Sequence, residues 1–273
     1  MPLITLTTDF GTKDPDLGYL KSQIIRQIPD AQILDISHQV TPFDPQESVY
    51  IIENSLQDFP ENTIHIIGID STASKQQAPV LIVSNGQYYL GNDNGILATA
   101  LAKQPASYYL LKGINGAGFM QTHILAAAKI SKGIMPDEIG QKTPELQQVL
   151  MSNPLVKHDE QTGKVSLIAP QVIYNDHYGN AIFNLKKETF EAWQKSRKFK
   201  IKLGHYEIDH LIDNYHDGLK HDKNMTLAGE MFARFNRFGY FEIFIYKSNR
   251  MTGGANTLLG LQKNKTVHII FEE

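Results

Sequence analysis

The sequence contains no cysteine, which excludes disulfides, thiolate nucleophiles and thiolate metal ligands. It also lacks an excess of basic residues, because 26 lysines and arginines stand against 29 aspartates and glutamates. The resulting charge of -3 gives no electrostatic footprint for nucleic acid. No apolar run approaches the roughly 18 residues that a membrane-spanning helix needs. We therefore expect a soluble cytoplasmic protein that has neither nucleic acid nor a membrane as a partner.

The first half of the chain alternates short apolar segments with segments of helical periodicity. This alternation is typical of a mostly parallel sheet covered by helices. It predicts an α/β domain over residues 1–152, with helices at 17–27, 45–59 and 124–132. The strands that we expect in this domain are residues 3–7, 32–36, 63–69, 80–84, 87–90 and 108–111.

The second half has a different character. Residues 153–163 are polar and rich in turn formers, and we interpret them as a linker. Beyond them, short segments rich in β-branched and aromatic residues are separated by turns, and 188–195 is the one convincing helix. This pattern predicts a smaller all-β domain over 164–273, resembling a barrel or a sandwich. Its expected strands are residues 165–169, 171–175, 198–203, 206–211, 240–246 and 266–271.

The first predicted strand ends in Thr-Thr-Asp-Phe-Gly, which presents Asp9 at its carboxyl end. Ligand chemistry in open α/β sheets gathers at this edge. Two more acids, Asp14 and Asp16, follow before the first helix. Phosphate prefers backbone donors and cations, so an acidic loop suits the hydroxyls or amines of a small ligand that lacks phosphate.

Three further polar segments interrupt apolar runs. The hydroxyl-rich segment Gly68–Ser74 places Asp70 after a second strand, and Gly91–Gly95 reads as an ordinary turn. In the second half, the Asp176 carboxylate offers an acceptor that suits an amine, and the Asn180 amide suits the edge of a nucleobase. The histidine- and aspartate-rich stretch 205–221 lacks a compact ligand spacing, so we expect a solvated loop there and no metal.

Taken together, these motifs resemble the S-adenosylmethionine hydroxide adenosyltransferase family, which is related to the fluorinases and chlorinases. The resemblance covers nearly the whole chain and depends on the order and spacing of motifs that are individually weak. It implies an α/β domain followed by a β-barrel domain. It also implies a homotrimer with ligand sites between subunits. The motifs are Thr8-Asp-Phe-Gly11, Leu34-Asp-Ile-Ser-His38, Val40-Thr-Pro-Phe-Asp44, Asp93-Asn-Gly95, Asp176-His-Tyr-Gly-Asn180 and Phe238-Gly-Tyr-Phe-Glu-Ile243.

The resemblance implies a displacement at the ribose C5′ of S-adenosylmethionine, in which water attacks and adenosine and methionine form. No cofactor is implied, because the sulfonium leaving group already carries the positive charge. Asp70 would be the catalytic group, with Lys75 and His123 as candidate helpers. The implied substrate contacts are Asp9 with the ribose hydroxyls, Phe43 with the pocket wall, Asp14 and Asp176 with the methionine portion, Asn180 with the adenine edge, and Phe238.

The chain departs from the family pattern around the attacking water. The hydrolases use an aspartate, an arginine and a histidine there, and Gln77 and Met120 stand at the last two positions. This leaves an alternative open, in which the protein binds S-adenosylmethionine or adenosine but has lost the chemistry. A halogenase is less favoured, since the Asp70 carboxylate would repel a halide by about 4 kcal/mol at about 4 Å.

Overall fold

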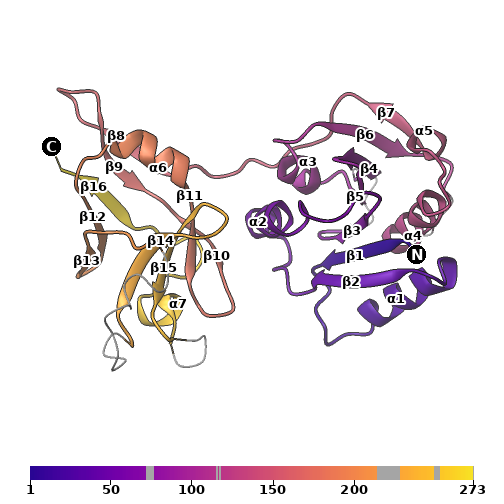
Figure 1. The fold of residues 1–273 in the computed structure, drawn as a ribbon, viewed down its shortest axis with the longest axis horizontal. Coiled ribbons are helices and arrows are strands. Elements are labelled where there is room, and N and C mark those ends of the chain that lie inside the picture. Colours follow the sequence, from indigo (N-terminus) through magenta and orange to yellow (C-terminus); the bar gives the residue numbers. More distant parts are fainter. Residues whose placement is uncertain (72–76, 115, 117, 214–227, 249–252, 273) are drawn as a thin grey trace. The chain divides into compact units, whose positions relative to one another are not determined.

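The computed structural model describes the whole chain except residues 72–76, 115, 117, 214–227, 249–252 and 273 (Figure 1). The chain divides into two compact units, Met1–Leu150 and Met151–Glu273. The first unit combines helices with one sheet and the second consists mainly of strands, which confirms the predicted architecture of an α/β part followed by a β part. Within the described residues, no helix combines the length and the apolar character needed to cross a bilayer.

The first unit is built on a seven-stranded mixed sheet with the order β2-β1-β3-β5-β4-β6-β7. The pairs β1/β2, β1/β3 and β3/β5 are parallel, whereas β4/β5, β4/β6 and β6/β7 are antiparallel. The site-bearing strands β1 and β3 therefore lie next to each other in the parallel part. The strands are β1 Leu3–Thr8, β2 Gln32–Ser37, β3 Ile64–Gly68, β4 Pro79–Ser84, β5 Gln87–Asn92, β6 Ala106–Leu111 and β7 Gly140–Thr143.

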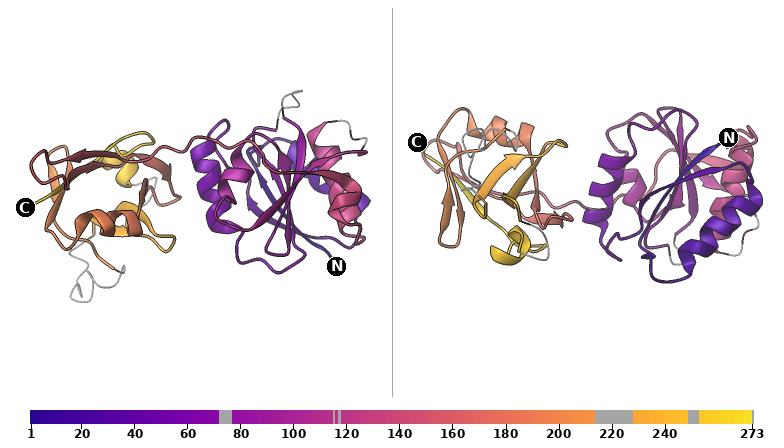
Figure 2. Two further views of the ribbon diagram at one scale, coloured as in Figure 1. Left: turned by 90° about the horizontal axis from the view of Figure 1, so that it is seen from above. Right: turned by 60° about the horizontal axis from the view of Figure 1, so that its bottom comes forward.

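Helices cover this sheet, and α1 and α4 pack against each other on one of its faces (Figure 2). Helix α1 is amphipathic, because Leu20 and Ile24 are buried one turn apart while Tyr19 is exposed. Helix α2 begins where the Asp44 carboxylate accepts the backbone N–H of Glu47 at 3.1 Å. The helices are α1 Asp16–Gln27, α2 Pro45–Ser55, α3 Ile96–Ala100, α4 Phe119–Ile130 and α5 Pro136–Ile139.

The strand β1 is buried along most of its length, and its two faces serve different purposes. Ile4 and Leu6 join the core beneath α1 and α4, together with Leu20 and Ile24. The alternate residue Thr5 lies on the other face, because successive strand residues point to opposite sides of a sheet. The strand is thereby packed against other residues on both faces, up to and including its last residue, Thr8.

The second unit contains two antiparallel sheets with the orders β10-β11-β15-β14 and β13-β12-β16-β9-β8. Side chains of both sheets share one hydrophobic core, to which Phe183, Ile201 and Phe241 belong. Strand β8 lies inside the stretch interpreted as a linker and pairs with β9. The elements are β8 Leu155–His158, β9 Val165–Ala169, β10 Val172–Asn175, β11 Ala181–Lys186, α6 Lys187–Gln194, β12 Phe199–Leu203, β13 Tyr206–Ile208, β14 Met231–Phe235, β15 Tyr240–Ile245, α7 Ala255–Leu258 and β16 His268–Phe271.

Candidate functional site

The ends of β1 and β3 bring Asp9 and Asp70 together. The parallel register pairs Thr8 with Gly68, so the residues that follow them leave the sheet side by side. The backbone N–H of Asp9 donates to the Gly68 carbonyl at 3.3 Å, and the backbone N–H of Asp70 donates to Asp9 Oδ2 at 3.0 Å. Asp70 has a positive φ of 44°, a conformation that non-glycine residues seldom adopt. Two half-buried carboxylates thus lie at one edge of the sheet.

The turn before α3 supports this edge. Asn94 donates its side-chain amide to the Ile69 carbonyl at 2.9 Å, directly before Asp70. Asp93 instead accepts the backbone N–H of Gln147 at 2.8 Å. Strand β5 therefore ends at Asn92, and in the bend over residues 93–95 the side chains of Asp93 and Asn94 bond neighbouring loops.

Asp14 and Phe43 lie on exposed segments of the same unit. Asp14 precedes α1 and is exposed. Phe43 is 74% exposed and has a φ of 60°, which is strained for a bulky side chain. An aromatic ring held in this way immediately before a helix cap marks a position worth testing for ligand contact.

The candidate helpers of Asp70 have different environments. His123 is completely buried on α4, and its Nε2 is 2.6 Å from the carbonyl oxygen of Gly91. Gln77 is partly buried, and its Oε1 has no hydrogen-bond partner within the described residues. Lys75 lies outside the described residues. The roles of Lys75 and His123 therefore stay predictions.

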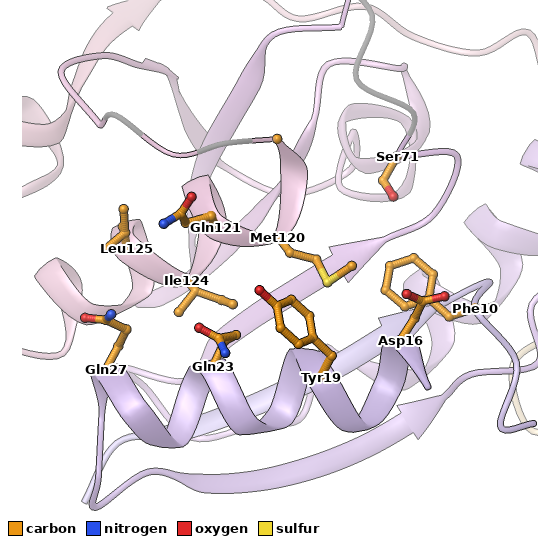
Figure 3. Close-up of a pocket in the computed structure, with 11 residues that line it drawn as sticks. Phe10, Asp16, Tyr19, Gln23, Gln27, Ser71, Met120, Gln121, Ile124 and Leu125 are labelled. Carbon is orange, nitrogen blue, oxygen red and sulfur yellow. The ribbon is translucent and has the colours of Figure 1, made fainter. Parts of the chain in front are cut away.

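A cavity of about 540 Å³ lies between α1 and α4 and reaches Ser71 and Phe10, the residues that follow Asp70 and Asp9 (Figure 3). Met120 and Ile124 contribute an apolar wall from α4. The α1 side of the cavity is polar. Its polar residues 16, 19, 23 and 27 are three or four positions apart, a spacing that identifies one helical face and is visible in the sequence. The lining residues are Phe10, Asp16, Tyr19, Gln23, Gln27, Ser71, Gly118, Met120, Gln121, Ile124 and Leu125.

In the second unit, Asp176 and Asn180 form one hydrogen-bonded motif. Asp176 Oδ1 accepts the backbone N–H groups of Tyr178 and Asn180, both at 2.9 Å, and Oδ2 accepts the Asn180 side-chain amide at 2.9 Å. This bond fixes the orientation of the amide and leaves Asn180 Oδ1 buried, with no hydrogen-bond partner among the described residues. Gly179 is required between them, since its φ is 80° and a Cβ would lie 2.6 Å from Asn256 Oδ1.

These two residues open on a second cavity, of about 420 Å³. Its charged members include Arg234, whose Nη2 lies 3.0 Å from Glu242 Oε1. Arg234 was not selected from the sequence, because it meets Glu242 only through the pairing of β14 with β15. The lining residues are Asp176, Tyr178, Asn180, Arg234, Tyr246, Lys247 and Ser248.

Burial dominates the electrostatics of this second cavity. It raises the pKa of the Asp176 carboxyl, although the hydrogen bonds from Asn180 and Tyr178 and the charge of Arg234 act in the opposite direction. It likewise raises the pKa of Glu242, against the effect of Arg234. Both acids therefore hold their protons more tightly than exposed carboxyls do.

Phe238 lies in the turn between β14 and β15 and is not among the residues that line this second cavity. Its backbone N–H donates to Asn236 Oδ1 at 3.0 Å, and the Arg237 guanidinium lies 4.5 Å from the centre of its ring. Its contact with substrate stays a prediction.

The described part of the histidine-rich stretch shows His210 Nδ1 2.9 Å from Asp209 Oδ1, and His216 and His221 lie outside the described residues.

The described residues thus form an α/β unit and a mainly β unit, each with a cavity that an aspartate helps to line. The family models for the N-terminal and C-terminal domains of the S-adenosylmethionine hydroxide adenosyltransferases match residues 4–140 and 170–268. The chain belongs to this family, and the resemblance seen in the sequence is confirmed.

Individual relatives agree with the assignment. The chain is 29% identical over 215 residues to an (R)-S-adenosyl-L-methionine hydrolase of Methanocaldococcus jannaschii, covering 75% of this chain and 74% of that protein. It is 32% identical over 63 residues to a fluorinase of Actinoplanes, covering 23% of this chain and 21% of the fluorinase. A crystal structure of a conserved, uncharacterised Thermotoga maritima protein has the same fold, with a TM-score of 0.78 and 20% identity over 98% of this chain and 99% of that one.

Proposed function

We propose that this protein hydrolyses S-adenosylmethionine to adenosine and methionine. The observation that carries the proposal is the pair Asp9 and Asp70, joined at the ends of adjacent parallel strands. The family assignment and a relative named as a hydrolase of this compound support it. Asp9 has one carboxylate oxygen bonded to the Asp70 N–H, and its other oxygen is available to accept the ribose hydroxyls.

In the proposed reaction, a water oxygen attacks C5′ from the side opposite to sulfur. The C5′–S bond breaks, its electron pair goes to sulfur, and methionine leaves as a neutral thioether. The proton lost by the water passes to the Asp70 carboxylate and then to solvent. The protein contributes mainly by aligning the water behind C5′ and by removing its other hydration.

The remaining contacts complete the proposed substrate site. Asn180 Oδ1, a buried acceptor without a partner among the described residues, suits the exocyclic amine of adenine. Asp14 and Asp176 would receive the methionine ammonium. Phe43, exposed and strained, would wall the site, which agrees with a homotrimer whose sites are completed by another subunit. From the sequence we also expect Phe238 to contact the substrate and the protein to be cytoplasmic.

A second candidate function is binding of S-adenosylmethionine or adenosine without catalysis. The environment of the proposed helpers favours it, because Met120 lines the first cavity and His123 is bonded to a backbone carbonyl in the core.

The test is incubation of the purified protein with S-adenosylmethionine, followed by chromatography for adenosine and methionine. The hydrolase proposal predicts both products from the unmodified protein and none from Asp70→Ala. If calorimetry shows binding but no product exceeds the Asp70→Ala background, the hydrolase proposal fails and only the binding function remains. Absence of both binding and product would refute both candidates.

A further inference from the structure

A chain of buried hydrogen bonds lies directly behind the turn that carries Asp9. Thr8 Oγ1 is 2.8 Å from His38 Nδ1 and also accepts the backbone N–H of Phe10 at 3.3 Å. Thr8 is completely buried and His38 is 5% exposed. Both groups are therefore sheltered from water. In such a buried environment a hydrogen bond is strong, and the loss of one partner is costly.

The imidazole of His38 connects Thr8 to an ion pair on its other side. Which of Thr8 Oγ1 and His38 Nδ1 donates depends on the tautomer of the ring, whose other nitrogen is Nε2. That nitrogen lies 3.2 Å from Asp35 Oδ1, and Lys21 Nζ lies 2.6 Å from Asp35 Oδ2. Burial tends to raise the pKa of Asp35, but the hydrogen bonds and charges of Lys21 and His38 outweigh it and lower that pKa. The Asp35 carboxylate, itself paired with Lys21, thus lies beside the outer nitrogen of the ring.

The backbone of His38 holds the other end of the same turn. The N–H of Gly11 donates to the His38 carbonyl at 2.7 Å, with Gly11 in the left-handed region at a φ of 70°. His38 therefore fixes the chain both before and after Asp9, through its ring at Thr8 and through its carbonyl at Gly11. Asp9 itself contributes no bond to His38, and its carboxylate remains directed to the Asp70 turn.

We propose that His38 is a positioning residue, which acts through the Thr8 hydroxyl to hold the Asp9 turn in its ligand-binding geometry. The identity of the ligand in this inference rests on the proposed function. Its physical content is preorganisation: a carboxylate held in place before binding needs less ordering when the ribose hydroxyls arrive.

The test uses a matched pair of isosteric substitutions on β1. Thr8→Val removes the hydroxyl that bonds His38 and accepts the Phe10 N–H, and Thr5→Val removes an equally buried hydroxyl that lies 2.7 Å from His65 Nδ1, three residues from the turn. Both variants lose a buried threonine–histidine hydrogen bond, so both should melt at a lower temperature than the unmodified protein. We expect only Thr8→Val to weaken adenosine binding, by about tenfold or more, in calorimetry. Thr8→Ser, which keeps the hydroxyl, should restore the affinity.

Amide hydrogen exchange supplies a readout that needs no ligand. Thr8→Val should exchange faster than the unmodified protein at residues 9–11, and Thr5→Val should not. Equal exchange at these residues in all variants would overturn the proposal, and so would equal losses of affinity in Thr8→Val and Thr5→Val. If the unmodified protein binds no adenosine, the proposed function fails, and the exchange comparison alone then decides whether the Thr8 hydroxyl holds the turn. His38→Phe keeps that hydroxyl and its bond to the Phe10 N–H, so it should also exchange faster at residues 9–11, and unchanged exchange in this variant would overturn the role of His38.

Discussion

Removal of the Asp9 carboxylate is expected to weaken binding of adenosine and S-adenosylmethionine strongly. Its Oδ2 accepts the Asp70 N–H at 3.0 Å, and in the proposed site its second oxygen accepts a ribose hydroxyl. A hydrogen bond to a charged group contributes about 1.5–3 kcal/mol. Since about 1.4 kcal/mol corresponds to a factor of ten, Asp9→Ala should lower the affinity by roughly 10- to 150-fold. The Asp70 N–H also loses its acceptor, which adds to the loss.

The assay is titration calorimetry with adenosine and with S-adenosylmethionine. Asp30→Ala serves as the control, since Asp30 is an aspartate that pairs with the N-terminal amine at 3.9 Å, where both groups are exposed. The control should bind as the unmodified protein does. If Asp9→Ala bound either ligand with unchanged affinity, the assignment of Asp9 to the ribose would be refuted.

Two further predictions concern stability. Burial lowers the pKa of His65 to about 4, so between pH 6.5 and 4 the unfolded chain binds a proton that the native protein does not. The free energy of unfolding should therefore fall by about 3 kcal/mol as the pH drops through this range, and urea titrations of His65→Asn should show a flatter dependence. Arg234→Met would leave Glu242, which is 3% exposed, without its cation and should cost about 3–5 kcal/mol in the same titration. Lys200→Met, which breaks exposed ion pairs, should cost little, and an equal loss in both variants would contradict this account.

The sequence predicted the part of the site that depends on strands. Asp9 and Asp70 each follow a buried apolar run, and the carboxyl ends of parallel strands meet at one edge of a sheet. The structure joins them through the Asp70 N–H because β1 and β3 are neighbours. The alternation of elements also predicted the α/β and all-β units, and this fold class is confirmed.

Element boundaries were harder to predict, for local reasons. Periodicity extended the second helix to residue 59, but α2 ends at Ser55. Pro60 disfavours helical backbone at Phe59 alone, and the helix ends earlier, with Leu56 as its C-terminal cap. Strand β5 continues through Gly91 and Asn92, which the sequence placed in a turn. Strands β11 and β14 were not predicted, because pairing with β15 stabilises them more than their own alternation reveals.

The contribution of α4 to the site could not be predicted, because it depends on which face of this helix meets α1. His123 lies three residues after Met120, a spacing that places two side chains near each other on a helix. In the structure Met120 lines the first cavity, whereas His123 contacts the Gly91 carbonyl in the core. The place of Arg234 follows from the register of β14 with β15, which sequence periodicity does not specify.

Hydrolysis in H₂¹⁸O tests the central claim most directly, because it reports which atom water attacks. If water attacks C5′, adenosine formed from S-adenosylmethionine will carry ¹⁸O in its 5′-hydroxyl and methionine will carry none, as mass spectrometry will show. Formation of unlabelled adenosine, or of no adenosine beyond that of Asp70→Ala, would contradict the proposed reaction.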